Sequence, residues 1–114
     1  MDKISYINIE STNHCNLDCS FCNRRDVVGN NLLHMSLSNF EMIMSKLKND
    51  GHYLENAKLM GLGEPMLHPK FDKMSGILKR YFPDCNLLVA TNCQYKMPPW
   101  FEKSLEYIDN MYFS

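Results

Sequence analysis

The apolar and polar positions along the 114 residues follow two periods. Short apolar runs rich in strand-forming residues predict strands, and longer runs with apolar residues three and four positions apart predict helices. Strands are predicted over residues 5–10, 57–60, 86–91 and 110–114. Helices are predicted from Ser38 to Gly51, from about Pro69 to Phe82, and over a short stretch that opens at residues 98–99. The elements therefore alternate as β-α-β-α-β-α-β.

Signals at the helix ends support these assignments. Ser38 to Glu41 has the capping-box pattern, in which the first side chain caps the helix and the glutamate reaches back to it. Gly51 is a natural helix stop, Pro69 suits a first helical turn, and Pro83 ends the second helix. The expected core faces are two apolar stripes: Phe40, Ile43, Met44 and Leu47, and then Phe71, Met74, Leu78 and Tyr81.

Alternation of this kind predicts an α/β fold with parallel strands joined by helical crossovers, in one domain over residues 1–114. Ligand sites in such sheets gather at the carboxyl ends of the strands. Three polar segments follow predicted strands: the loop 11–25, the turn 61–65 and residues 91–93. This coincidence of positions is the first indication of function.

Composition excludes several classes of function. Apolar residues make up 45% of the chain and charged residues 22%, with a net charge of -1 and no basic patch, so nucleic-acid binding is not expected. The N-terminus lacks an apolar signal region, and no apolar run approaches about 18 residues, so no membrane span is expected. We therefore expect a cytoplasmic protein, in which the five cysteines are metal ligands or reduced thiols.

Three of these cysteines form a candidate metal site. Cys15, Cys19 and Cys22 give the spacing CxxxCxxC in a polar loop. Thiolates suit iron-sulfur clusters and zinc. A structural zinc site needs four closed ligands, whereas three cysteines on a cubane leave one iron open, so the spacing favours an open cluster. Zinc with His14, Cys85 or Cys93 as fourth ligand is an alternative, as are three thiols without metal.

The cysteine spacing after a first strand resembles that of the radical S-adenosylmethionine (radical SAM) superfamily. Phe21 stands where that family has an aromatic residue before its third cysteine, and the turn with Gly61, Gly63 and Glu64 resembles its Gly-Gly-Glu motif. Asn92 lies in a segment similar to the family's Thr-Asn-Gly, and Ser114 falls where a serine is common on strand four. Residues 66–69 resemble members that have a cysteine-rich C-terminal extension and often modify peptides.

The resemblance implies a 4Fe-4S cluster on the three cysteines, with SAM bound to the open iron. Phe21 would pack near the adenine, and Gly61 and Gly63 would let backbone approach the methionine part of SAM. Glu64 would help to accept hydrogen bonds from the SAM ammonium group. The implied oxidoreductase chemistry is reductive cleavage of SAM to a 5′-deoxyadenosyl radical that abstracts hydrogen from an unknown substrate, with peptides as a candidate class. A flavodoxin- or ferredoxin-like protein would supply the electron.

Two departures from the family pattern bear on these expectations. Cys93 replaces the family's glycine. The second departure is that the sequence stops in the fourth predicted strand. The resemblance therefore implies an incomplete (β/α) partial barrel of about four parallel strands and three helices, truncated in strand four. An open sheet edge would then be available to a partner chain or a second copy. A cluster-binding or SAM-binding fragment without turnover and a zinc-binding module are the alternative functions.

Overall fold

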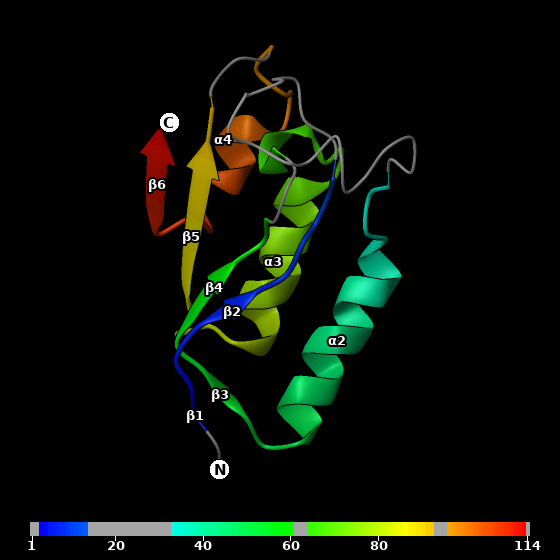
Figure 1. Cartoon of the computed structure of the whole chain (residues 1–114), viewed down its shortest axis with the longest axis vertical. Coiled ribbons are helices and arrows are strands. Elements are labelled where there is room, and N and C mark those ends of the chain that lie inside the picture. Colours follow the sequence, from blue (N-terminus) through cyan, green and yellow to red (C-terminus); the bar gives the residue numbers. More distant parts are fainter. Residues whose placement is uncertain (1–2, 14–32, 61–63, 93–95, 114) are drawn as a thin grey trace.

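The computed structural model describes residues 3–13, 33–60, 64–92 and 96–113. Four parallel strands form the main sheet in the order β2-β4-β5-β6. Their bounds are Ile7–Asn8 (β2), Asn56–Lys58 (β4), Asn86–Thr91 (β5) and Asn110–Phe113 (β6). A second, two-stranded parallel sheet pairs β1 (Lys3–Ile4) with β3 (Tyr53–Leu54). The predicted parallel α/β order is confirmed, and Figure 1 shows all four strands of the main sheet running toward the same edge.

The first predicted strand is wrong in its bounds, because 5–10 is not one uninterrupted strand. β1 and β2 lie on either side of Ser5 and Tyr6. The register does not shift across this break, since Ile4 pairs with Leu54 and Ile7 pairs with Ala57. The side chain of Asn56 donates to the Ser5 carbonyl at 2.9 Å, in the gap between the two paired stretches. β3 was not predicted, and β4 begins at Asn56 and ends at Lys58 rather than covering 57–60.

Three helices follow the predicted order: α2 (Leu37–Asn49), α3 (Phe71–Tyr81) and α4 (Phe101–Ser104). The capping box predicted at Ser38 is wrong. Ser36 is the N-cap, and its hydroxyl accepts from the Asn39 backbone at 3.1 Å, which places Ser38 inside the first turn. Glu41, the proposed box partner, instead pairs with Arg80 of α3. The predicted stop is confirmed, because Gly51 adopts φ 81° just after the helix.

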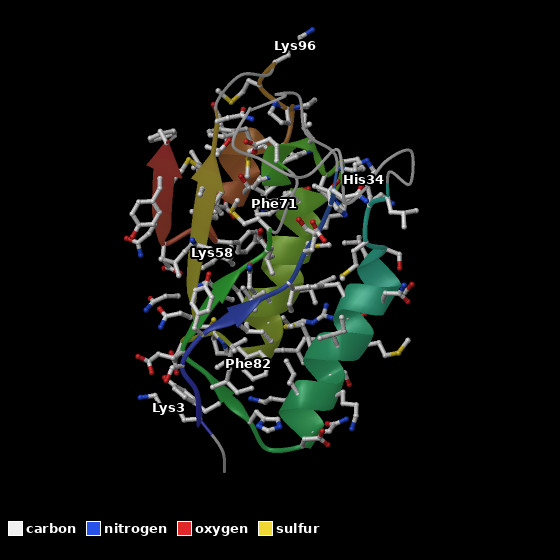
Figure 2. The ribbon with its side chains drawn as sticks, viewed as in Figure 1. Lys3, His34, Lys58, Phe71, Phe82 and Lys96 are labelled. Carbon is white, nitrogen blue, oxygen red and sulfur yellow. The ribbon has the colours of Figure 1, made fainter. Side chains whose placement is uncertain are left out.

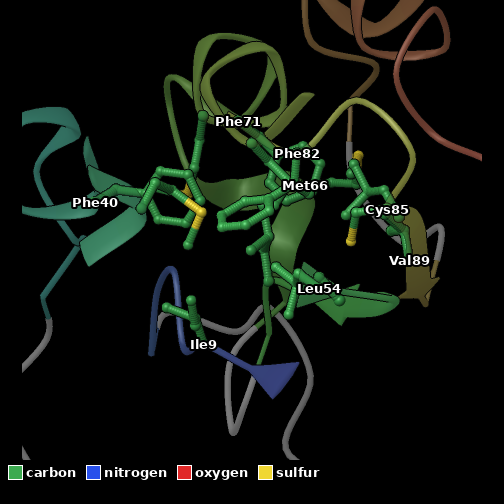
Figure 3. Close-up of a cluster of buried hydrophobic side chains, with 14 residues drawn as sticks. Ile9, Phe40, Leu54, Met66, Phe71, Phe82, Cys85 and Val89 are labelled. Carbon is green, nitrogen blue, oxygen red and sulfur yellow. The ribbon is translucent and has the colours of Figure 1, made fainter. Parts of the chain in front are cut away.

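The core lies between the sheet and the helices (Figure 3). Phe40 and Met44 of α2 and Phe71 of α3 are fully buried, as the apolar stripes predict. Burying each such side chain contributes roughly 1.5–3 kcal/mol. The buried positions of the strands alternate, with Ala57, Leu59, Leu87 and Val89 on the helix face. The helices therefore hold one face of the sheet firmly and leave its carboxyl edge to polar residues.

The other face of the sheet is less buried among the described residues. Asn8, Lys58, Leu88 and Asn110 share one register row across the four strands and do not belong to the core cluster. β6 is an edge strand of this described sheet, with Tyr112 54% and Phe113 69% exposed. The described strands thus form an open arc rather than a closed barrel, as predicted.

Within the described part of the chain, no helix is long and apolar enough to cross a membrane.

Candidate functional site at the carboxyl edge of the sheet

Three polar segments meet where β2, β4 and β5 end. Past β2, the buried Ser11 hydroxyl donates to the carbonyl of Leu59, which follows β4. Past β4, Glu64 reaches Thr91 and Asn92 at the end of β5. The parallel topology therefore brings the described parts of all three predicted segments together at one edge.

Glu64 is buried at this edge, with 4% of its surface exposed. One carboxylate oxygen, Oε2, accepts from the Met66 backbone N–H at 2.9 Å and from the Thr91 hydroxyl at 2.9 Å. The other, Oε1, accepts from the Asn92 backbone N–H at 2.7 Å. Glu64 thereby caps the short 3₁₀ helix η1 (Pro65–Leu67) and ties it to β5. A carboxylate has about four acceptor positions, so this brace uses most of them.

Paired backbone flanks the segment of the sequence that carries the three cysteines. We call this pairing the neck: residues 11–13 with 33–35. Thr12 and His34 form an antiparallel bridge. The Met35 N–H donates to the Ser11 carbonyl at 2.8 Å, and the Asn13 N–H donates to the Leu33 carbonyl at 3.2 Å. Side chains reinforce the bridge, since the Asn13 side-chain oxygen accepts from the Leu33 N–H at 2.7 Å. Both ends of the loop are thus fixed beside β2.

A histidine joins the neck to η1. His68 follows η1 and is 2% exposed. Its Nε2 lies 2.7 Å from the Met35 carbonyl, and its Nδ1 accepts from the Lys70 backbone N–H at 3.0 Å. Because a carbonyl only accepts and an amide only donates, the ring is neutral, with its proton on Nε2. Burial lowers the pKa of His68, the bond to Met35 opposes this, and the charge of Lys70 adds to it.

A second histidine lies against the first. The rings of His34 and His68 meet edge to face, with centroids 5.3 Å apart, and His34 Nδ1 lies 2.7 Å from the Thr12 hydroxyl. Figure 2 shows His34 just before the start of α2, beside the blue segment that follows β2. Open cavities flank this pair. One, of about 460 Å³, includes Thr12, His34 and Asn39 in its wall, and another, of about 390 Å³, includes both histidines and Lys70.

Most predicted site residues lie outside the described residues: Cys15, Cys19, Cys22, Phe21, Gly61, Gly63 and Ser114, together with His14 and Cys93. Of the rest, Glu64 and Asn92 are joined by a hydrogen bond at the sheet edge. Cys85, an alternative zinc ligand, is buried in the core between α3 and β5. Among the described residues, no three His, Cys, Asp or Glu side chains gather as a metal site.

Sequence reasoning missed the roles of Ser11, Thr12, His34 and His68. The polar Ser11-Thr12-Asn13 run directly after the first strand was the available signal. The pairing of this run with residues 33–35, across the whole cysteine loop, had no signal of its own.

No protein-family model matches the chain, and no curated protein matches it. Two solved structures of BtrN share its fold. In the complex of BtrN with AdoMet and 2-DOIA, the TM-score is 0.80 at 23% identity over 97% of this chain and 46% of that chain. In selenomethionine BtrN in an open conformation, it is 0.78 at 24% identity over 97% of this chain and 50% of that chain. The chain thus spans about half the length of BtrN, and its mixed α/β fold matches that part of the BtrN structure.

Proposed function

We propose that this chain is a radical SAM protein, with a 4Fe-4S cluster on Cys15, Cys19 and Cys22 and SAM bound beside it. The observation that supports the proposal is that the described residues beside the three motifs meet at one edge of a sheet whose fold is shared with a protein crystallised with AdoMet. The spacing CxxxCxxC and the Gly-x-Gly-Glu-Pro turn supply the chemistry that a shared fold alone does not specify.

The chain's donor set fits these groups. Three thiolates are soft ligands of the kind that iron-sulfur clusters take. Held by these three cysteines, a cluster would supply one-electron reductive cleavage of SAM, with an external donor as the source of the electron.

The described residues hold the frame for this chemistry. The neck fixes both ends of the cysteine loop, and the Glu64 brace fixes the segment that follows Gly61 and Gly63 against β5. Glycines at those two positions leave room for a ligand to approach the backbone. Most of the acceptor positions of Glu64 are used by the brace. In this proposal the backbone carbonyls of the turn therefore accept most of the hydrogen bonds from the SAM ammonium group.

Two classes of substrate follow from the observations. The likeness of residues 66–69 to peptide-modifying members points to peptides, and the structural neighbour is bound to 2-DOIA, so compounds related to 2-DOIA form the second class. A flavodoxin- or ferredoxin-like protein would donate the electron, and a partner chain or second copy would cover the exposed β6 edge.

The test is anaerobic reconstitution of the chain with iron and sulfide, reduction with dithionite, addition of SAM, and assay of 5′-deoxyadenosine. We expect a cluster spectrum and product. Alanine at Cys15, Cys19 or Cys22 should abolish both. Cys85→Ala is the matched control, because this thiol is 1% exposed within the core, and it should retain both signals.

The outcomes separate the alternatives. A cluster without 5′-deoxyadenosine supports a binding fragment that needs a partner for turnover. Retention of zinc alone, with no cluster chromophore, refutes the proposal and favours a zinc-binding module. Equal cluster loss in Cys85→Ala and Cys15→Ala would show that the signal reports folding rather than ligation.

A further inference from the structure

We infer that His68 is a positioning residue that fixes the neck of the cysteine loop against η1, and that it does so only as the neutral imidazole. The inference deepens the proposed function, because the neck holds the segment on which the cluster ligands lie. It rests on the hydrogen bonds of His68, on its burial and on the charges around it.

The hydrogen bonds of His68 require one particular tautomer. The Nε2–H donates to Met35 in the neck, and Nδ1 accepts from the Lys70 N–H on the other side of the ring. A proton added to Nδ1 would face the Lys70 N–H, so the charged ring cannot keep both bonds. With 2% of its surface exposed, His68 has little water to replace a lost partner. Protonation therefore favours movement of the ring away from the neck.

The charged groups around His68 oppose its protonation. From its own segment Lys70 faces the 390 Å³ cavity, and from the neck His34 contacts the ring edge to face. His68 also lines a further open cavity, of about 380 Å³, whose wall includes Lys96 from the segment after β5. From α2 the lining residues are uncharged, and neither cavity includes an acidic residue among its described lining. No described lining carboxylate would stabilise the charged ring.

The direction of the pH effect follows. The pKa of His68 is lowered in the folded chain, so the neutral ring and its contribution are present above the ordinary value of about 6.5. The contribution is lost as the pH falls through the lowered pKa. The paired backbone of the neck should therefore loosen as the pH falls through this lowered pKa.

The first experiment measures the neck without any metal. Amide hydrogen exchange of the cluster-free chain is followed by NMR at Met35 in the neck and at Val89 in the core, each rate divided by its intrinsic rate. His68→Ala should speed Met35 exchange about tenfold, the factor expected from losing one hydrogen bond, and leave Val89 unchanged. His68→Gln, whose amide can still donate to the Met35 carbonyl, should restore much of the protection and remove its dependence on pH.

His52→Gln is the matched control, because His52 follows α2 at the opposite end of that helix from the neck. It should exchange like the wild type at Met35. The inference is overturned if Met35 protection is the same in the wild type, His68→Ala and His68→Gln, or if the wild type loses no Met35 protection at any acid pH at which Val89 stays protected. If His68→Ala does not fold, His68→Gln and the pH profile of the wild type decide.

The second experiment uses the reconstituted protein and follows iron release to a chelator. The wild type should release iron faster as the pH falls below about 6.5, and His68→Gln should lose that step. Equal release profiles for the wild type, His68→Gln and His52→Gln would count against the inference. If no cluster assembles in the wild type, the proposed function fails, while hydrogen exchange at the neck still decides the role of His68.

Discussion

Replacing Glu64 tests whether its carboxylate braces the carboxyl edge of the sheet. Three donors converge on it: the Met66 N–H, the Thr91 hydroxyl and the Asn92 N–H, at 2.9, 2.9 and 2.7 Å. A hydrogen bond to a charged group is worth about 1.5–3 kcal/mol. The three are not additive, and water can enter the space left by truncation, so we expect Glu64→Ala to lower the free energy of unfolding by about 4 kcal/mol.

Glu64→Gln is the sharper test, because it preserves size and shape. Its amide oxygen can replace Oε2 and keep two bonds, but its NH₂ group then faces the Asn92 N–H, donor against donor. We expect a loss of about 2 kcal/mol, the value of one charge-assisted bond. Urea unfolding, followed by the fluorescence of the single tryptophan and by circular dichroism, measures it. Trp100 reports on this region, since its ring stacks on Phe71 at 6.2 Å.

A double-mutant cycle with Thr91→Val isolates one bond of the brace. We expect a coupling of about 1–2 kcal/mol between Glu64 and Thr91. Glu102→Gln is the control, because Glu102 is exposed on α4, and it should stay within about 0.5 kcal/mol of the wild type. A Glu64→Gln variant as stable as Glu102→Gln, with no coupling to Thr91, would refute the reasoning.

Two further predictions concern the rest of the chain. Ser36→Ala should lower the free energy of unfolding by about 1 kcal/mol, since it removes the cap of α2, whereas Ser38→Ala should change it by less than about 0.5 kcal/mol; equal losses in urea unfolding would contradict the observed cap. Burial raises the pKa of the Cys85 thiol to about 11, so mass spectrometry should find Cys85 slow to alkylate in the folded chain and fast in urea. Equal rates of alkylation would show that the site is open.

The fold was predictable where a single face of an element is buried. The stripes through Phe40 and Phe71 identified α2 and α3, because period and burial agree along each helix. The bounds of β5 were predicted in full, since it is bounded by turn residues and buried at every second position. The break between β1 and β2 was not predictable, because it arises opposite Glu55 and Asn56, residues on a remote segment. The cap of α2 was predicted at the wrong residue because Ser36 and Ser38 are both suitable N-cap residues. In the structure the Ser36 hydroxyl accepts the hydrogen bond from the Asn39 backbone.

The candidate site divides in the same way. The family resemblance named Glu64 and Asn92 as candidates, and topology predicted that their segments would meet, as the hydrogen bond between them shows. The histidines carried no comparable signal, because the partners of His68 are a backbone carbonyl and a backbone N–H. Backbone partners leave no trace in residue identity, and the contact with Met35 forms only after the chain has returned from the cysteine loop. Such contacts depend on the complete fold, so residue patterns alone do not predict them.

The two polar anchors stand at opposite ends of one short turn. Glu64 caps the start of η1 and holds it to β5, and His68 caps its end and holds it to the neck. η1 spans three residues, so neither anchor can shift far without moving the other. We therefore expect a displacement of the neck to move η1 and, through Glu64, the end of β5. In the proposed function these segments flank the cluster and SAM. The short helix η1 would therefore fix the position of the neck relative to the end of β5.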